Sequence, residues 1–127
     1  MTTREFLTNL NACEEGLIAV GNEPLKDRWK KSVRGDWLIW LLGRGIGQSG
    51  WPSKSQVLEV FARCLDSLGR SEPAMIRYLE RDHDSLYITQ TMVDTITEAC
   101  EKEPVKLAAL CNVIRGAIEV PALDTLT

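Results

Sequence analysis

The sequence contains only one histidine, no closely spaced pair of cysteines and no long apolar run. Its longest run of apolar residues has six members, at 37–42, whereas a helix that crosses a bilayer needs about 20. The first residues, Met1 to Phe6, lack the basic start and the apolar stretch of a signal peptide. We therefore expect a cytosolic protein without membrane contact.

The four cysteines, none of them in a Cys-x-x-Cys pair, are Cys13, Cys64, Cys100 and Cys111. A reducing cytosol disfavours disulfides, and each thiol falls among apolar residues at helical spacing, where a free cysteine behaves as a small hydrophobe. We therefore expect core residues, with no metal and no cofactor. A zinc site that combines these thiols with His83 stays a minor alternative, because structural zinc sites use short paired ligand spacings.

The single histidine also limits the catalytic chemistry. A serine or cysteine nucleophile with a histidine base would have to use His83, yet its neighbours Asp82 and Asp84 belong to a polar stretch that is typical of a solvated loop. The glycine-rich segment 45–52 does not match a phosphate-binding loop, which needs a preceding strand and a Gly-Lys-Ser/Thr start to the next helix. We expect a connector whose Trp51 folds back onto the core, and a protein that is not an enzyme.

The apolar run at 37–42 forms the centre of the predicted fold. Because the run has no polar face at the helical or the strand period, we expect a helix over 36–42 that is buried on all sides. Asp36 suits the first turn, where a carboxylate can accept backbone N–H groups. Gly43 or Gly45 can adopt the left-handed conformation that closes a helix.

Two tryptophans of this run, Trp37 and Trp40, lie three residues apart, so we expect both on one side of the helix and mostly buried. Truncation of either one to alanine would then cost about 3–5 kcal/mol of stability. The predicted structural core residues are Trp29, Trp37, Trp40, Leu41 and Phe61.

Helical spacing of apolar residues recurs along the rest of the chain. Residues 85–103 contain several threonines that favour strands, but the four-residue spacing of Ile88, Met92, Ile96 and Cys100 indicates a helix. The sum is an all-α protein: a compact single domain, 1–121, of six or seven short helices around a buried central helix, with a loose tail at 122–127. The other predicted helices cover 3–11 (capped by Thr2 or Thr3), 12–20 (capped by Asn11), 24–33, 53–68 (with a capping box at Ser53), a segment that begins at Ser71, and a last segment that ends at Pro121.

Charge is unevenly distributed, although the net charge is only −3. Between residues 72 and 103, eight acidic residues stand against three basic ones, a local charge of −5. Between residues 26 and 44, six basic residues stand against two acidic ones, a local charge of +4. Such runs are often only solvated helix faces. As a partner-binding surface we favour the acidic set, Glu80, Asp82, Asp84 and Asp94. The alternative is the basic set, Arg28, Lys30, Lys31 and Arg34, which could contact a nucleic acid.

Three strings of this sequence, Ala12-Cys13, Trp29 and Arg34-Gly-Asp-Trp-Leu-Ile-Trp-Leu-Leu-Gly43, resemble the signature Ala-Cys … Trp … Arg-x-Asp-Trp-x-x-Trp-Leu of a known family. Over residues 10–68 the chain resembles small helical proteins that are found in phages, prophages and bacterial toxin neighbourhoods and are described as immunity proteins. The resemblance implies a bacterial cytosol and no catalytic residues.

The function that this resemblance implies is inhibition by binding. Such a protein would cover a partner protein, either a toxin or a host-defence component such as a CRISPR effector. A nucleic-acid-binding accessory protein that uses the basic set is the alternative, and a homodimer is left open.

Overall fold

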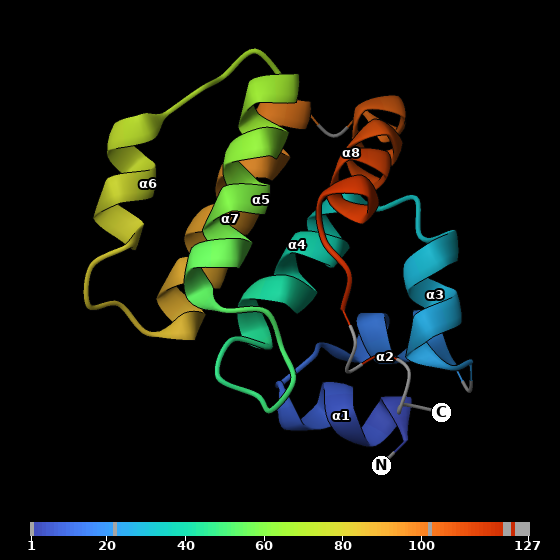
Figure 1. The fold of residues 1–127 in the computed structure, drawn as a ribbon. Helices are drawn as coiled ribbons and strands as arrows, with labels where there is room; N and C mark the ends of the chain where they lie inside the picture. The colour runs from blue at the N-terminus through green and yellow to red at the C-terminus, as the bar shows by residue number, and fades with distance from the viewer. Residues whose placement is uncertain (1, 22, 102, 121–122, 124–127) are drawn as a thin grey trace.

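The structure is a computed structural model, and it describes residues 2–21, 23–101, 103–120 and 123. In these residues the chain forms eight helices and no strand, so the predicted all-α class is confirmed with one or two helices more than expected. None of the described helices is long and apolar enough to span a bilayer. The helices are α1 (Thr3–Asn9), α2 (Glu14–Val20), α3 (Leu25–Lys31), α4 (Gly35–Arg44), α5 (Lys54–Ser67), α6 (Pro73–Leu79), α7 (Ser85–Cys100) and α8 (Pro104–Ala117) (Figure 1).

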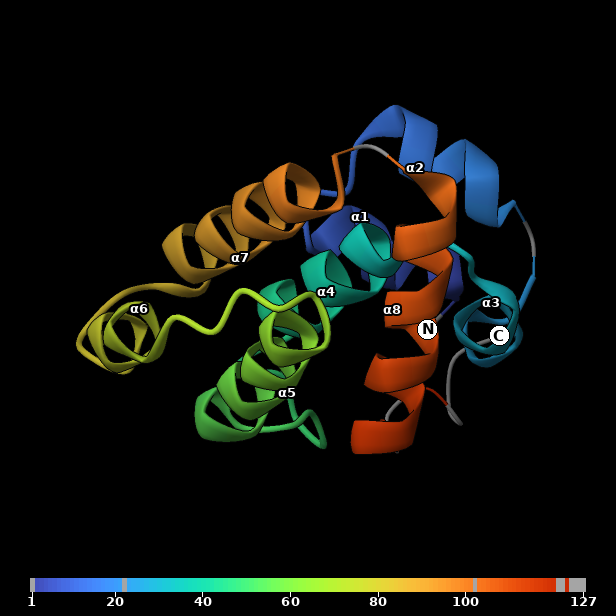
Figure 2. The same cartoon turned by 90° about the horizontal axis from the view of Figure 1, so that it is seen from above.

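Helix α4 lies at the centre of a single domain, as predicted. It packs most extensively against α7 and then against α8, while α5 packs against α8 (Figure 2). Helix α6 lies at one edge of the molecule, and α1, α2 and α3 gather at the other end (Figure 1). The three long helices α5, α7 and α8 therefore cover one part of α4, and three helices of seven residues each accompany the other part.

Close contact between α4 and α7 depends on Gly43. A Cβ atom at this position would overlap the hydroxyl of Thr89 and would lie 2.9 Å from Cε of Met92. The prediction that Gly43 or Gly45 closes the helix in a left-handed conformation is wrong. Gly43 lies inside α4, and Gly45 has a φ of −77° because the helix ends without a reversal of handedness. Lack of space also explains why position 45 is a glycine, since a Cβ atom there would overlap the ring of Trp51.

Trp51 folds back onto the core, as predicted. Its Nε1 donates a hydrogen bond of 3.0 Å to the carbonyl oxygen of Leu42, and its ring lies 5.6 Å from that of Phe6. The glycine-rich connector between α4 and α5 is thereby fixed to both α4 and α1.

Burial of the predicted core residues is mixed. Trp29, Leu41 and Phe61 are buried, which confirms them as core. Trp37 and Trp40 are partly exposed but mostly covered, as predicted for these two rings, whereas the prediction that α4 is buried on all sides is wrong. The reason is that the side of α4 that carries these two rings faces α2 and α3, which are too short to cover it.

Helix starts follow the sequence at two sites and depart from it at three. Thr2 and Ser53 each form the expected capping box. Asn11 does not cap α2; Sγ of Cys13 accepts a hydrogen bond from the N–H of Gly16 instead, and Asn11 adopts a φ of 62°. The start of α6 is Glu72 rather than Ser71, without a side-chain cap. Asp36 accepts no backbone N–H among the described residues, and its two oxygens bind the guanidinium of Arg34 instead.

Helix α7 resolves the conflict between spacing and propensity in favour of spacing. Ile88, Met92 and Ile96 are fully buried on its inner side. The hydroxyls of Thr91 and Thr95 donate to the carbonyl oxygens of Tyr87 and Thr91, four residues earlier, so that these polar groups are satisfied within the helix.

The predicted loose tail at 122–127 lies outside the described residues except for Leu123, which is buried in the core. Three of the cysteines, Cys64, Cys100 and Cys111, are buried as expected. Cys13 is exposed, so the expectation that all four are core residues is wrong for this one. Its place at the start of α2, where the sulfur serves as the cap, explains the difference.

Candidate binding surfaces

The acidic set lies mostly at one place, the connection between α6 and α7. Glu80 follows the last residue of α6, Asp82 lies in the connection, and Asp84 precedes α7; all three side chains are exposed. Asp84 also has a structural role, since its Oδ1 accepts a hydrogen bond of 2.8 Å from the N–H of Tyr87. Asp94 lies further along α7 and accepts a hydrogen bond from Gln90.

Aromatic rings accompany these carboxylates. The ring of His83 lies with its centroid 4.6 Å from the rings of both Tyr78 and Tyr87. The two tyrosine hydroxyls are 3.4 Å apart, and this hydrogen bond raises the pKa of Tyr87. Both tyrosines remain 44 % exposed, and Leu86 beside them is 60 % exposed.

We refer to Tyr78, Glu80, Asp82, Leu86 and Tyr87 as the α6–α7 surface. The sequence pointed to its carboxylates through their charge but not to its two tyrosines or to Leu86. The missed signal is that Tyr78 and Tyr87 stand on either side of the polar stretch around His83, one near the end of α6 and one near the start of α7. Asp94 follows Tyr87 by seven residues, close to two full turns, and therefore lies on the same side of α7.

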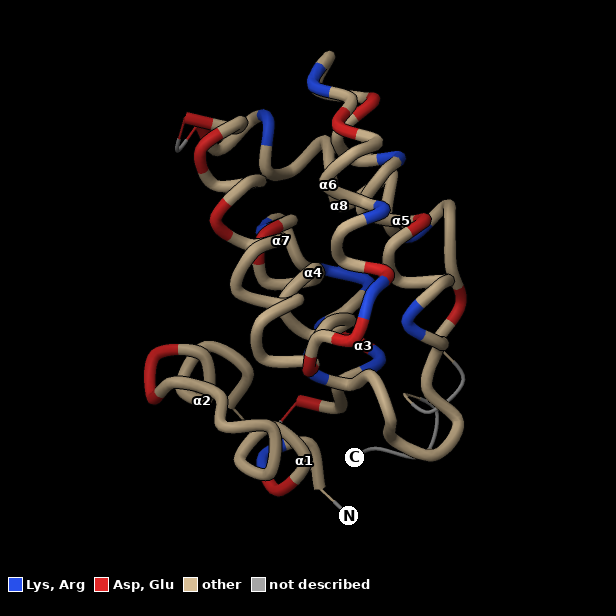
Figure 3. The backbone as a smooth tube through the Cα atoms, turned by 90° about the vertical axis from the view of Figure 1, so that its left-hand side faces the viewer, with Lys and Arg blue, Asp and Glu red and all other residues tan. Residues whose placement is uncertain are grey.

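The local charge of this region is mixed rather than uniformly acidic. Arg77 and Arg81 are exposed in the same part of the chain, and Lys54 donates to the carbonyl oxygen of Arg81. Figure 3 looks onto the side of the molecule that carries α6 and marks the charged positions along the backbone; those of α2 are all red. The charged residues of α7 are likewise all acidic, Asp94 and Glu98.

Two members of the basic alternative set, Lys31 and Arg34, are paired with carboxylates of the protein itself. Both Nε and a terminal nitrogen of Arg34 bind Asp36, at 3.0 and 2.8 Å, and its guanidinium lies 4.7 Å from the ring centre of Trp37. Lys31 lies 3.7 Å from a carboxylate oxygen of Glu23. Within the described chain, the side chains of Arg28 and Lys30 form no ion pair, and only Lys30 of these two is exposed.

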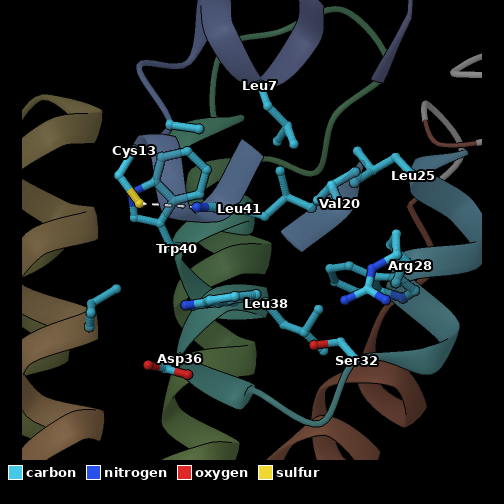
Figure 4. A pocket seen from close by; sticks show the side chains of 15 residues that line it. Leu7, Cys13, Val20, Leu25, Arg28, Ser32, Asp36, Leu38, Trp40 and Leu41 are labelled. Atoms are coloured by element: carbon cyan, nitrogen blue, oxygen red, sulfur yellow. Dashed lines mark hydrogen bonds between the residues drawn. The ribbon is translucent and has the colours of Figure 1, made fainter. Parts of the chain in front are cut away.

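A pocket of about 270 Å³ opens between α2, α3 and α4 (Figure 4). Its wall is largely apolar, with Trp40 and Cys13 on one side and Leu25 and Arg28 on the other. Helix α2 has no fully buried residue, and its Ile18 is 66 % exposed. The pocket thus exists because α2 lies beside α4 without packing tightly on it.

The pocket also brings together the strings that carry the family resemblance. The sequence predicted Trp29, Trp37, Trp40 and Leu41 as core residues and did not predict a cavity beside them. The members of these strings that line the pocket are Ala12, Cys13, Trp29, Asp36, Trp37, Leu38, Trp40 and Leu41.

The polar groups in this wall are few. Asp36 is neutralised by Arg34, whose own pKa is raised by the hydrogen-bonded carboxylate. Ser32 contributes a hydroxyl group, and Cys13 contributes the sulfur atom that caps α2. Arg28 therefore contributes the one charge in the described wall that no ion pair balances.

No three residues of the types His, Cys, Asp and Glu come close enough together to hold a metal ion in the described part of the chain. His83, the histidine of the alternative zinc site, lies between two tyrosines. Burial raises the pKa of the Cys64 thiol to about 12 and also raises those of Cys100 and Cys111. These three thiols are therefore protonated, core-type residues at neutral pH.

Fold and surfaces together define an all-α protein with an aromatic and acidic surface at α6–α7 and an apolar pocket under α2. Comparison of the chain with family models, with curated proteins and with solved structures finds no match. The immunity-type function that the sequence resemblance implies stays a prediction.

Proposed function

We propose that this protein is a non-catalytic inhibitor of the immunity type, which acts by covering a partner protein with its α6–α7 surface. The observation that carries the proposal is the exposure of Tyr78, Leu86 and Tyr87 beside the carboxylates of Glu80 and Asp82. The partner would be a toxin or a component of host defence.

Protein interfaces favour this combination of residues. Tyrosine is enriched among the few residues that carry most of the binding free energy, because it offers a large apolar area and a polar end with little loss of side-chain freedom. In this protein His83 packs against both rings, which limits their motion before a partner arrives. Surface carboxylates around such a centre accelerate association with a basic partner and help to exclude others.

The chemistry of the partner follows from this charge. Glu80 and Asp82 have no ion pair within the described chain, so their charge is available for a partner with lysine or arginine at its surface. Proteins that handle nucleic acids have such surfaces. A nuclease toxin or a nucleic-acid-guided defence complex would therefore suit the α6–α7 surface.

Comparative affinity capture would test the proposal. Wild-type protein and the variant Tyr78→Ala/Glu80→Lys/Asp82→Lys would be immobilised in parallel and exposed to lysate of a bacterial host, with mass spectrometry of the bound proteins. Asp84 is left unchanged because it caps α7. Glu119→Lys, another exposed carboxylate, serves as the control for a general change in charge. We expect a protein that binds the wild type and Glu119→Lys but not the triple variant.

Kinetics with the captured protein would then separate the two contributions. Charge reversal at Glu80 and Asp82 should mainly slow association and make it less sensitive to salt, whereas Tyr78→Ala should mainly speed dissociation, by about tenfold or more. Unchanged binding of the triple variant would contradict the proposal. If Lys30→Glu abolished binding in that case, the basic set and a nucleic-acid or acidic partner would become the better explanation.

A further inference from the structure

We infer that the pocket between α2, α3 and α4 binds a small apolar carboxylate, a compound with an aromatic or medium-length aliphatic body and one acidic group. The body would lie against Trp37 and Trp40, and the carboxylate would pair with Arg28. This site is separate from the α6–α7 surface and does not depend on the proposed function.

Shape and composition support an apolar guest. The volume of about 270 Å³ is slightly below the range of about 300–1,000 Å³ that is typical of ligand sites for drug-sized compounds, so it suits a compound of smaller size. Side chains from five helices make up most of the wall, among them Leu7, Val20, Leu25, Leu38 and Val93. The two half-buried indoles add flat apolar faces that an acyl chain or an aromatic ring would cover.

Because α2 packs incompletely, a bound ligand would gain binding free energy by covering apolar side chains that are now partly exposed. Helix α2 presents Leu17 and Val20 toward the core only in part and has no fully buried residue. A ligand in the pocket would remove the exposed part of Val20, and the facing surface of α4, from water. The protein itself offers no side chain that does so in the described structure.

Charge selects an acid over a base. The carboxylate of Asp36 already holds two hydrogen bonds from Arg34, so it is occupied by an internal partner. The guanidinium of Arg28 lines the same pocket without an ion pair among the described residues. An arginine in a partly apolar pocket binds a carboxylate through two parallel hydrogen bonds, whereas an ammonium ligand would meet a like charge.

Titration with octanoate tests the site, with octanol as the probe that lacks the charge and acetate as the probe that lacks the apolar body. Calorimetry would measure affinity, and tryptophan fluorescence would report on location, since Trp29, Trp37 and Trp40 all line the pocket. We expect saturable octanoate binding with a change in fluorescence, at least tenfold weaker binding of octanol, and no binding of acetate.

Two variants tie this binding to the pocket. Gly16 lines it, lies within α2, and a Cβ there would meet only Sγ of Cys13, at an ordinary 3.6 Å. Gly16→Leu should therefore fold, fill the pocket and abolish octanoate binding. Arg28→Gln should weaken octanoate about tenfold, to the level of octanol, while Lys30→Gln on the same helix should leave it unchanged.

The inference is overturned if octanoate does not bind, or if it binds folded Gly16→Leu as well as it binds the wild type. Equal effects of Arg28→Gln and Lys30→Gln would also overturn the role of Arg28. None of these variants alters the α6–α7 surface, so failure here would leave the proposed function standing, and the converse also holds.

Discussion

The two sides of α4 differ in how completely the rest of the chain covers them. On one side Ile39 and Leu42 are fully buried, and Gly43 allows close contact with α7. On the other side Trp37 and Trp40 are half-buried and border a pocket. Both sides carry large apolar side chains, so the presence of such residues alone does not determine which side is covered.

This difference shows that the length of the covering helices determines how much of α4 is buried. Helix α7 has 16 residues and extends about 24 Å, enough to cover the whole of α4. Helices α2 and α3 have seven residues each and extend about 10 Å. Short helices bury little area and leave the larger rings of α4 partly in water.

The largest expected effect comes from truncation of α4 on its buried side. Ile39→Ala should lower the free energy of unfolding by about 2–5 kcal/mol, since the residue is fully buried and its loss leaves a cavity. Trp37→Ala should cost less than about 2 kcal/mol, below the value for a buried tryptophan, because the ring already lies partly in solvent beside Arg34. Urea denaturation of both variants measures this; equal losses would erase the difference between the two sides.

A smaller effect should follow from addition of one methyl group at the contact between α4 and α7. Gly43→Ala forces the new Cβ into Thr89 and Met92 and should cost about 1–3 kcal/mol. The matched control is Gly116→Ala in α8, where no atom lies within 4 Å of the new Cβ. The control should gain up to about 1 kcal/mol, since glycine is unfavourable inside a helix. An increase in melting temperature for both variants would contradict this, because it would show that the contact between α4 and α7 can accommodate an added methyl group.

Loss of a helix cap should lower the stability more at α5, in the well-packed part of the molecule, than at α2, beside the pocket. Ser53→Ala removes a capping box at the start of α5 and should cost about 1 kcal/mol. Cys13→Ala should cost less, because a thiol sulfur accepts hydrogen bonds weakly. Cys13→Ser should stabilise α2, by a few tenths of a kcal/mol. Chemical denaturation would contradict this assignment if Cys13→Ala proved the more harmful of the two truncations.

The smallest expected effect is on thiol reactivity, which reports how the four cysteines are buried. In the folded protein at pH 8 only Cys13 should react with a small thiol reagent, and all four cysteines should react in denaturant. Cys64, with a folded pKa of about 12 against an ordinary value of 9.0, stabilises the fold below pH 9 and loses this contribution as the pH rises toward 12. Mass spectrometry of the labelled protein counts the modified thiols; fast labelling of a second cysteine in the native state would contradict the burial.

Much of the fold could be predicted from the sequence, because local signals decide it. The capping residues Thr2 and Ser53 and the four-residue spacing of Ile88, Met92 and Ile96 each act within one or two turns. The conflict with the strand-favouring threonines ended in favour of the helix since their hydroxyls bond to their own helix.

The sites depended on distant contacts and were predicted only in part. Charge pointed to Glu80 and Asp82, yet the pairing of Tyr78 with Tyr87 through His83 depends on how α6 turns into α7. The sequence did not predict the pocket, because the local pattern does not show that the seven-residue α2 leaves part of α4 uncovered. How much of one helix is covered by another depends on contacts between residues that are far apart in the chain, and the local sequence pattern does not predict these contacts.

Native-state hydrogen exchange of α2 and α4 tests the central claim most directly, namely that α2 lies beside the core without being part of it. Amides in the last turn of α2, up to the Gly21 N–H that bonds to the Leu17 carbonyl, should exchange by local opening, at a free energy well below that of global unfolding and with little dependence on denaturant. Amides of Ile39 and Leu42 in α4 should exchange only through global unfolding. Equal protection of the two helices, with the same dependence on denaturant, would contradict the claim.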